Sequence, residues 1–392
     1  MKEFNLNRIN IEKLKLGESP LKLIKTTYND LKIKDGYLQD EEGHKIGTKG
    51  DMYHKLIMDK ILQEGCLDHN PRPKYHDFYS DATYDDLKRI ITTKENEEIK
   101  VGDNETVIEK EHGVEVHVPA HTLSVNQGIE CIYDLSKGET PMITLRPIAI
   151  KTSVAEILWI YQKQSNDLVE FDELIGKNTW DKDHKINNWW EEWALRDENG
   201  NYILNEKSHP IIGSCYGGTT GPRNMIYTEV IEQIRKNPDG RRNITCLWQT
   251  DDFQRPHGLK PCAFLTVWNV RHGWDGLDYL DMTMIQRSSD FDTAACINQV
   301  QYVAEHKMVA RDLGYIPGIF TWKPVNVQIY DRHLDQTIEM LNREPINAKC
   351  SIELKEEVIS FNDVKPDDIY VDDYPKELIK IKNPQLKFPL GI

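Results

Sequence analysis

The chain has 392 residues, of which 39% are hydrophobic and 29% charged, as is ordinary for a globular protein with one large domain or two of usual size. Its formal net charge of -15 argues against stable, sequence-independent binding to nucleic acid, because such binding needs an excess of Lys and Arg. The sequence contains no run of about 18 apolar residues, so it predicts no membrane span.

The seven cysteines are scattered and form no CxxC pair, so the sequence predicts neither a disulfide framework nor a zinc site. The first residues lack the apolar core of a signal peptide. We therefore expect reduced thiols and a cytoplasmic protein, in the host cytoplasm if a phage encodes it.

The first half of the chain is uneven in pattern. Residues 1–50 are rich in Lys, Asp and Gly and show no long period, so we interpret them as an N-terminal extension of a main domain that spans residues 51–392. Apolar residues at helical spacing predict a helix from Met52 to Gly65. The acidic, polar stretch at about 77–117 is interpreted as an insertion or a surface hairpin.

The second half alternates helical and strand patterns. Helices are predicted around residues 154–161, 226–234 and 297–313. Strands are predicted for residues 243–248, 263–270 and 279–285. The chain is therefore predicted to be a mixed α+β protein, with its chemically capable residues mainly at strand ends and in loops.

A candidate thiol nucleophile and several arginines occur in separate segments. Cys262 opens an apolar strand, and a nearby cation such as Arg287 would lower its pKa. Arg241 and Arg242 follow a Pro-Asp-Gly turn, where guanidinium groups suit phosphate oxygens. The alternatives are a cysteine that merely fills the core and arginines that are merely solvated.

Further candidates for phosphate contact are Ser288, beside Arg287, and Arg72, which is expected on a stiff loop between two prolines. Glu156 lies near the apolar face of its helix, so burial with a raised pKa would suit proton transfer, although a solvent-facing glutamate fits the pattern equally well. Asn298 lies in an apolar setting, and its amide could read a pyrimidine edge or serve structural hydrogen bonds.

Taken in order, these segments resemble the thymidylate synthase family, most like phage deoxyuridylate hydroxymethylases and Firmicute-type thymidylate synthases. The resemblance runs from about Asn70 to the C-terminus, roughly three quarters of the chain. It rests on these motifs: Asn70-Pro71-Arg72-Pro73 with Pro119-Ala120-His121-Thr122-Leu123-Ser124, Glu156-Ile157-Leu158-Trp159, Trp190-Glu191-Glu192-Trp193, Tyr216-Gly217, the segments around Cys262 and Arg287, and the tail Phe388-Pro389-Leu390-Gly391-Ile392.

The resemblance implies a thymidylate synthase-like fold and a site for deoxyuridylate (dUMP) with 5,10-methylenetetrahydrofolate as co-substrate. Cys262 would add to C6 of the uracil ring, making C5 nucleophilic toward the one-carbon unit. It implies a homodimer with Arg241 and Arg242 contributed across the interface. The other implied roles are catalytic for Glu156, Tyr216 and Asp290, phosphate binding for Arg72, Arg287 and Ser288, nucleoside binding for Asn298, Gln328 and Tyr330, and folate binding for Trp190, Asp290 and Ile392.

Several positions depart from the family pattern. Ala263 replaces a histidine after the nucleophile, and Gln328 replaces one before the sugar-binding tyrosine, with Asn326 in place of an aspartate. Asp292 and Thr293 stand where the family has an apolar run beside the folate. Polar groups there could admit water, which hydroxymethylation needs and thymidylate formation excludes, although neutral drift would also explain them.

The sequence therefore favours a folate-dependent dUMP hydroxymethyltransferase that makes 5-hydroxymethyl-dUMP. The close alternative is a thymidylate synthase that makes dTMP. An alternative of another class is an inactive family member that binds a nucleotide or RNA as a regulator.

Overall fold

The computed structural model describes residues 32–67, 72–80, 106–110, 113–120, 122–126, 128–330 and 333–388. Its centre is a seven-stranded mixed sheet with the strand order β10-β11-β12-β13-β8-β4, in which β9 also pairs with β13. The strands are β4 Cys66–Leu67, β8 Thr122–Asn126, β9 Cys131–Asp134, β10 Asn243–Cys246, β11 Ala263–His272, β12 Asp278–Asp290 and β13 Ile316–Tyr330. Only β12 and β13 run parallel, and the other pairs are antiparallel.

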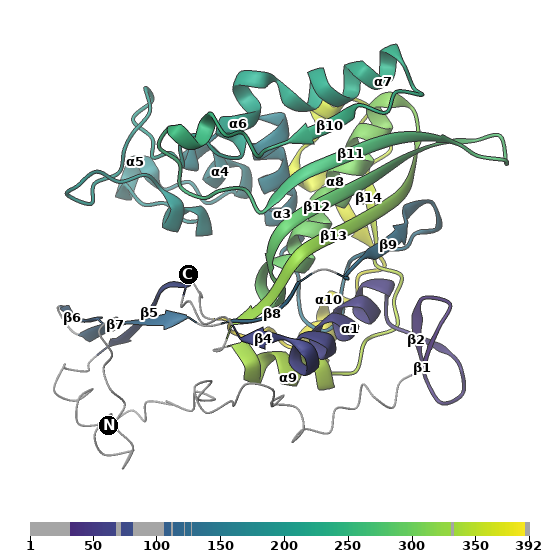
Figure 1. Cartoon of the computed structure of the whole chain (residues 1–392), viewed down its shortest axis with the longest axis horizontal. Helices are drawn as coiled ribbons and strands as arrows, with labels where there is room; N and C mark the ends of the chain where they lie inside the picture. Colours follow the sequence, from purple (N-terminus) through teal and green to yellow (C-terminus); the bar gives the residue numbers. More distant parts are fainter. Residues whose placement is uncertain are drawn as a thin grey trace.

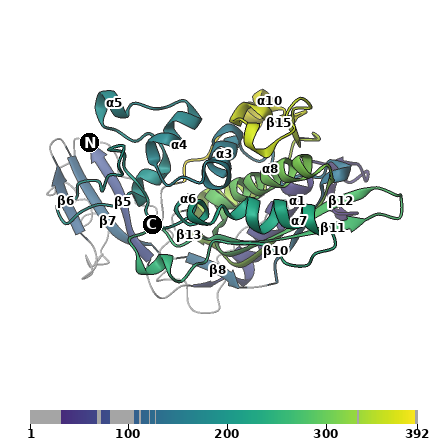
Figure 2. The same ribbon diagram turned by 90° about the horizontal axis from the view of Figure 1, so that it is seen from above.

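Helices cover one face of this sheet. The long helix α8 (Cys296–Leu313) packs on β12 and β13, and α3 (Ile150–Ile157) packs on α8, as the layers in Figures 1 and 2 show. The remaining α-helices are α1 Lys49–Glu64, α4 Leu168–Ile175, α5 Trp180–Asp183, α6 Gly217–Thr220, α7 Glu232–Lys236, α9 Leu334–Asn342 and α10 Lys376–Lys382. Within the described ranges, no helix is both long and apolar enough to cross a membrane.

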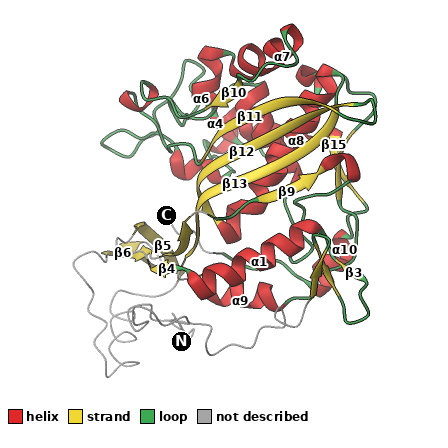
Figure 3. Cartoon of the chain, turned by 45° about the vertical axis from the view of Figure 1, so that its right-hand side comes forward, coloured by secondary structure: helices red, strands yellow, loops and turns green. Residues whose placement is uncertain are grey.

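The other face of the sheet carries apolar side chains that are exposed or half-buried. Strand pairing puts them on one side, because Ile244 pairs with Val267, Leu265 pairs with Ile285, and Val325 lies two residues beyond the strand partner of Ile285. They are Ile244, Leu265, Val267, Ile285 and Val325. Figure 3 shows β11, β12 and β13 side by side with α8 behind them. An apolar sheet face of this kind suits an interface with another protein.

Three smaller sheets lie around this core. Their orders are β1-β2-β3, β5-β7-β6 and β14-β15. The strands are β1 Lys32–Lys34, β2 Tyr37–Gln39, β3 Lys45–Ile46, β5 Arg72–Ser80, β6 Thr106–Lys110, β7 Gly113–Ala120, β14 Ser351–Leu354 and β15 Ile369–Asp372. The expected insertion at about 77–117 falls partly in the β5-β7-β6 sheet, which extends beyond β8 and β4 in Figure 1.

The expected N-terminal extension reaches the core in its last part. Leu38 of β2 is buried with the main core, and Thr48 caps α1 by accepting a hydrogen bond from the Asp51 N–H. The division of the chain at residue 50 remains a prediction.

The helical patterns are confirmed by α1, by α3 with the π-helical turn Leu158–Gln162, by Tyr227–Lys236 and by α8. The strands predicted at 243–248, 263–270 and 279–285 correspond to β10, β11 and β12. However, β12 continues to Asp290, and β13 was not predicted at all. The polar end of β12 is a strand because it pairs in parallel with β13, for example Ser288 with Asn326.

Candidate active site

Cys262 lies at the entrance of β11 beside Arg287 of β12. Nη2 of Arg287 is 3.6 Å from Sγ of Cys262, and the Arg287 backbone N–H donates to the Cys262 carbonyl over 2.9 Å. The Cys262 N–H donates to the hydroxyl of Tyr216 over 3.0 Å. Burial raises the pKa of the Cys262 thiol, while the positive charge of Arg287 and the contact with Tyr216 lower it.

The Arg287 guanidinium is held in place by the segment that precedes the cysteine. Nε donates to the Pro261 carbonyl over 2.9 Å and Nη2 to the Lys260 carbonyl over 2.7 Å. The guanidinium also lies 5.5 Å from the ring centre of Trp248. Because Arg287 is fixed against its own neighbours, its charge stays beside the thiol.

Tyr216 reaches Cys262 from a tight turn. Its φ is +47°, an uncommon value for a residue other than glycine, and it leads directly into α6. A Cβ on Gly217 would lie 1.7 Å from the Ser165 carbonyl oxygen, so only glycine fits there. The Tyr-Gly pair expected from the sequence therefore forms a strained turn that brings the phenol to Cys262.

Glu156 lies at the end of α3 and is 5% exposed. Burial raises its pKa to about 7, opposed by the hydrogen bond that it accepts from Nε1 of Trp189 over 3.0 Å. Trp190 is 1% exposed and packs edge-on against Tyr216, whereas Trp189 is 41% exposed. Trp189, which sequence reasoning missed, therefore hydrogen-bonds to the buried carboxylate and is itself partly exposed to solvent.

Asn298, near the start of α8, is bonded at both ends of its amide. Oδ1 accepts from Nε2 of Gln286 over 3.0 Å, and Nδ2 donates to Oε1 of Gln301 over 3.0 Å. One acceptor position and one N–H remain for a ligand. Sequence reasoning missed Gln286 and Gln301, although Gln286 directly precedes Arg287 in a segment that it had singled out.

Ser288 and Gln328 meet across the parallel strands β12 and β13. Nε2 of Gln328 donates to Oγ of Ser288 over 3.1 Å. Tyr330, at the end of β13, is buried, and its ring centre lies 5.5 Å from that of His333. The residues expected to bind phosphate and sugar are therefore neighbours at the end of the sheet that holds Arg287.

Asp290 ends β12 and has an unused acceptor. Its Oδ2 accepts a hydrogen bond from the Thr293 hydroxyl, while its buried Oδ1 accepts none among the described residues and lies 3.9 Å from Nδ1 of His333. Burial raises its pKa. Asp292 is fully buried; its Oδ2 accepts from the Thr337 hydroxyl of α9, and its Oδ1 likewise accepts no hydrogen bond among the described residues.

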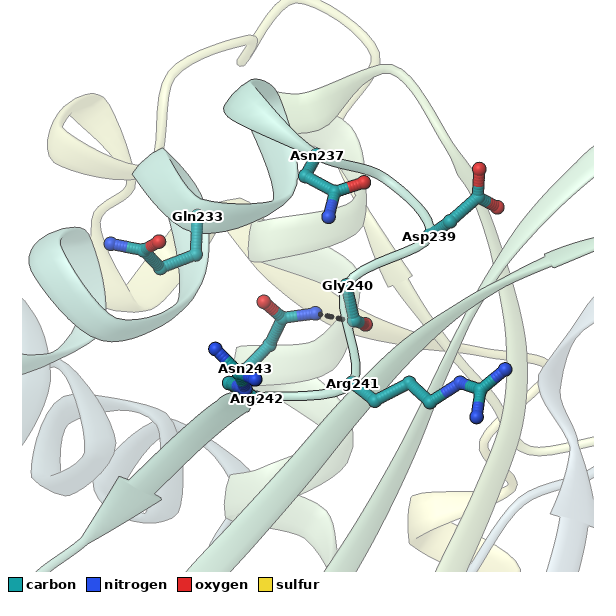
Figure 4. Close-up of a pocket in the computed structure, with 7 residues that line it drawn as sticks. All are labelled: Gln233, Asn237, Asp239, Gly240, Arg241, Arg242 and Asn243. Carbon is teal, nitrogen blue, oxygen red and sulfur yellow. Dashed lines mark hydrogen bonds between the residues drawn. The ribbon is translucent and has the colours of Figure 1, made fainter.

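Arg241 and Arg242 lie far from the thiol within one chain. They occupy the loop between α7 and β10, and Figure 4 shows them around a pocket that Gln233, Asn237 and Gly240 also line. Asn243 pairs with Trp268, which is six residues beyond Cys262 on β11 and therefore ~20 Å away. This arginine pair does not join the site of its own chain.

Two expected site residues cannot be placed. Arg72 begins β5, but the structure describes no side chain there, and Ile392 lies outside the described residues.

A sequence model described as thymidylate synthase matches residues 105–385. A thymidylate synthase of Streptococcus pneumoniae (strain 70585) is 34% identical over 88% of this chain and 100% of its own length. The chain belongs to the thymidylate synthase family. The thymidylate synthase of Lactococcus lactis subsp. lactis is 39% identical over 66% of this chain and 84% of its own length.

The thermostable thymidylate synthase A from Bacillus subtilis has the same fold, with a TM-score of 0.60 at 24% identity over 87% of this chain and 99% of its own. This match confirms the α+β, thymidylate synthase-like fold expected from the sequence. Thymidylate synthase family members bind dUMP, use 5,10-methylenetetrahydrofolate as co-substrate and are typically homodimers.

Proposed function

We propose that this protein transfers the one-carbon unit of 5,10-methylenetetrahydrofolate to C5 of dUMP and releases dTMP. The contact between the Cys262 thiol and the Arg287 guanidinium carries the proposal, because it places a candidate nucleophile beside a cation that is suited to phosphate and that opposes the effect of burial on the pKa of the thiol. The relatives named above are thymidylate synthases, so they support dTMP better than the hydroxymethyl product favoured by the sequence.

Cys262 acts as the nucleophile in this proposal. Its thiolate bonds to C6 of the uracil ring, and the electron pair of the C5–C6 double bond moves toward C5 and O4. C5 can then bond to the one-carbon unit. Once the C5 proton has left, the bond between the transferred carbon and the folate nitrogen would break. Hydride from the folate would then add to that carbon as the thiolate leaves C6 and the ring double bond is restored. Covalent addition thus divides one difficult substitution into easier steps.

Glu156 and Tyr216 are the proposed proton-handling groups. Glu156 has a pKa of about 7, so it can both accept and return a proton near neutral pH. Tyr216 touches the backbone of Cys262, and burial raises its pKa well above the usual range, so the phenol stays protonated. The two groups lie close enough that the charge of Glu156 acts on Tyr216.

The phosphate of dUMP is proposed to meet Arg72, Arg287 and Ser288 of one subunit, together with Arg241 and Arg242 of its partner. The ~20 Å separation along β11 rules out a single chain as the source of both sets, if both bind one phosphate. The apolar sheet face from Ile244 to Val325 supports pairing with a second copy.

The nucleoside is proposed to contact Asn298, Gln328 and Tyr330. Asn298 offers the free acceptor and donor that a uracil edge requires. Gln328, bonded to Ser288, stands in place of the histidine expected beside Tyr330 and can still donate or accept through its amide.

The residues around Asp290 fit a folate. Its Oδ1 is a buried acceptor without a hydrogen bond among the described groups, as a site for a pterin N–H requires. When bound, the co-substrate supplies the one-carbon unit and, for dTMP, the reducing hydride. Trp190 and Ile392 are the other proposed contacts, and the exposed Trp189 joins them.

Hydroxymethylation of dUMP is the second candidate, favoured by one observation. The Thr293 hydroxyl bonds to Asp290 and so places a polar group next to the proposed folate contact, where water could be oriented. Asp292 gives no such support, because it is 0% exposed and its Oδ2 bonds to Thr337 of α9.

Product analysis tests this proposal. Purified protein is incubated with dUMP and methylenetetrahydrofolate, and the products are separated by chromatography. Equal amounts of dTMP and dihydrofolate are expected. The appearance of 5-hydroxymethyl-dUMP with tetrahydrofolate would replace the first candidate by the second.

The same assay with Cys262→Ala addresses a regulatory role. We expect the variant to lose turnover while its fold is retained. If the wild-type protein showed no turnover and both proteins bound nucleotide or RNA equally, the protein would be a binding regulator and not an enzyme.

A further inference from the structure

A row of buried side chains runs from the middle of the sheet to Glu156. Nε1 of Trp322 donates to Oε1 of Gln286 over 3.0 Å. Nε2 of Gln286 donates to Oδ1 of Asn298 over 3.0 Å, and Nδ2 of Asn298 donates to Oε1 of Gln301 over 3.0 Å. Trp322, Gln286 and Gln301 are all buried. The row connects β13, β12 and α8.

The indole at its first end sets the direction of every amide in the row. The N–H of Trp322 can only donate, so Gln286 must turn its oxygen toward it and its NH2 toward Asn298. Asn298 then presents its oxygen to Gln286 and its NH2 to Gln301. Rotating one of these side-chain amides by a half turn would place two donors or two acceptors together in the buried interior, where neither could form a hydrogen bond.

This direction bears on base recognition. With its orientation set, Asn298 has one lone pair on Oδ1 and one hydrogen on Nδ2 left over. Uracil presents an N3–H donor next to the O4 acceptor, which matches that order. Cytosine presents an N3 acceptor next to an amino donor, which would match only a reversed amide.

The other end of the row approaches Glu156. Nε2 of Gln301 is buried and makes no hydrogen bond to another described group. Gln301 lowers the pKa of Glu156, against the larger increase that burial causes. The other polar neighbours of that carboxylate are the indoles of Trp189 and Trp190, and Tyr216 is a titratable group nearby. Gln301 thus lies between the base-reading amide and the proton-handling carboxylate.

We infer that Gln301 is a positioning residue that locks Asn298 in the orientation that selects uracil over cytosine and offers its remaining N–H to the Glu156 carboxyl group. This inference rests on the proposed function of the site.

Two variants separate the two roles of Gln301. Gln301→Leu removes both the acceptor for Asn298 and the donor for Glu156. The ratio of kcat/KM for dUMP to that for dCMP should fall by about tenfold, and the acid limb of the pH–kcat profile should move to higher pH. Gln301→Glu keeps an acceptor for Asn298 but offers a second carboxyl group to Glu156, so only the acid limb should move.

Gln299→Leu is the matched control. Gln299 is a buried glutamine on the same helix, but it bonds to the Tyr133 hydroxyl and the Ala295 carbonyl. Gln299→Leu should leave unchanged both the ratio of kcat/KM for dUMP to that for dCMP and the acid limb of the pH–kcat profile. The inference would be overturned if Gln301→Leu kept both wild-type values or if Gln299→Leu changed them equally.

An inactive wild-type protein would contradict the proposed function and not the positioning role. In that case the positioning role of Gln301 is tested by calorimetry, which gives the ratio of the affinities for dUMP and dCMP in wild type and variant. An unchanged ratio in Gln301→Leu would overturn it, and Gln301→Met, which also removes the amide acceptor for Asn298, serves if the leucine variant fails to fold.

Discussion

Nη2 of Arg287 lies 3.6 Å from Sγ of Cys262, and the same guanidinium is tied to the carbonyl groups of Lys260 and Pro261. Positive charge is therefore held beside a thiol whose pKa is raised by burial, and this charge opposes that increase. The first prediction follows from this arrangement.

Arg287→Leu should raise the pKa of Cys262, because burial then acts without the opposing charge. Alkylation of Cys262 by iodoacetamide at pH 8 should slow about tenfold, which corresponds to one pKa unit. Peptide mass spectrometry distinguishes Cys262 from the exposed Cys66. Arg271→Leu, which removes a surface arginine paired with Asp281, is the control. Equal alkylation rates in wild type and Arg287→Leu would contradict the role of Arg287.

Glu156→Gln should lower kcat by about 10²–10⁴-fold, a typical contribution of a general acid–base group, with little change in the affinity for dUMP. The carboxyl has a pKa of about 7 and must be ionised to accept a proton, so wild-type turnover should rise as the pH increases through 7. Stopped-flow measurement of dihydrofolate formation checks both statements. A glutamine variant with wild-type kcat would exclude Glu156 from proton transfer.

Trp189→Phe should move the acid limb of turnover to higher pH. The indole N–H donates to Glu156 and favours its charged form, so its removal raises the pKa of the carboxyl. Trp274→Phe is the control, because Trp274 is fully exposed on the β11–β12 hairpin. The pH profile of kcat is the measurement, and a superimposable profile for Trp189→Phe would count against the link.

Mixing two inactive proteins should restore activity if the arginine pair works across a dimer. Cys262→Ala and the double variant Arg241→Ala with Arg242→Ala are unfolded together and refolded. Half of the dimers are then mixed, and one of their two sites is intact, so about a quarter of wild-type activity is expected. If Arg241 and Arg242 served their own chain, no mixed dimer would have an intact site and no activity would return.

Asp292→Asn should weaken the pH dependence of stability. Burial raises the pKa of Asp292 from 3.8 to about 7, so between these values the folded protein binds a proton that the unfolded chain does not. The contribution is fully present below about pH 4 and is lost as the pH rises through 7. The free energy of unfolding in urea should therefore fall less between pH 5 and pH 8 in the variant. An equal fall in both proteins would argue against a buried, protonated carboxyl.

Much of the fold could be predicted because local patterns specify it. Apolar spacing located α1, α3 and α8, and β-branched runs located β10 and β11. The polar end of β12 and the whole of β13 escaped prediction, since their strand conformation depends on pairing with each other, for example Asp290 with Gln328.

The sequence by itself determined which reactive groups this protein possesses. They are a thiol at Cys262, a carboxyl group at Glu156 and arginines in segments suited to binding phosphate. Only the tertiary structure decided their contacts. Neighbouring Trp189 and Trp190 face opposite environments, and Gln301 joins Asn298 to the surroundings of Glu156. Hydrogen bonds of this kind depend on the orientation of whole elements, which residue types and spacing along the chain leave open.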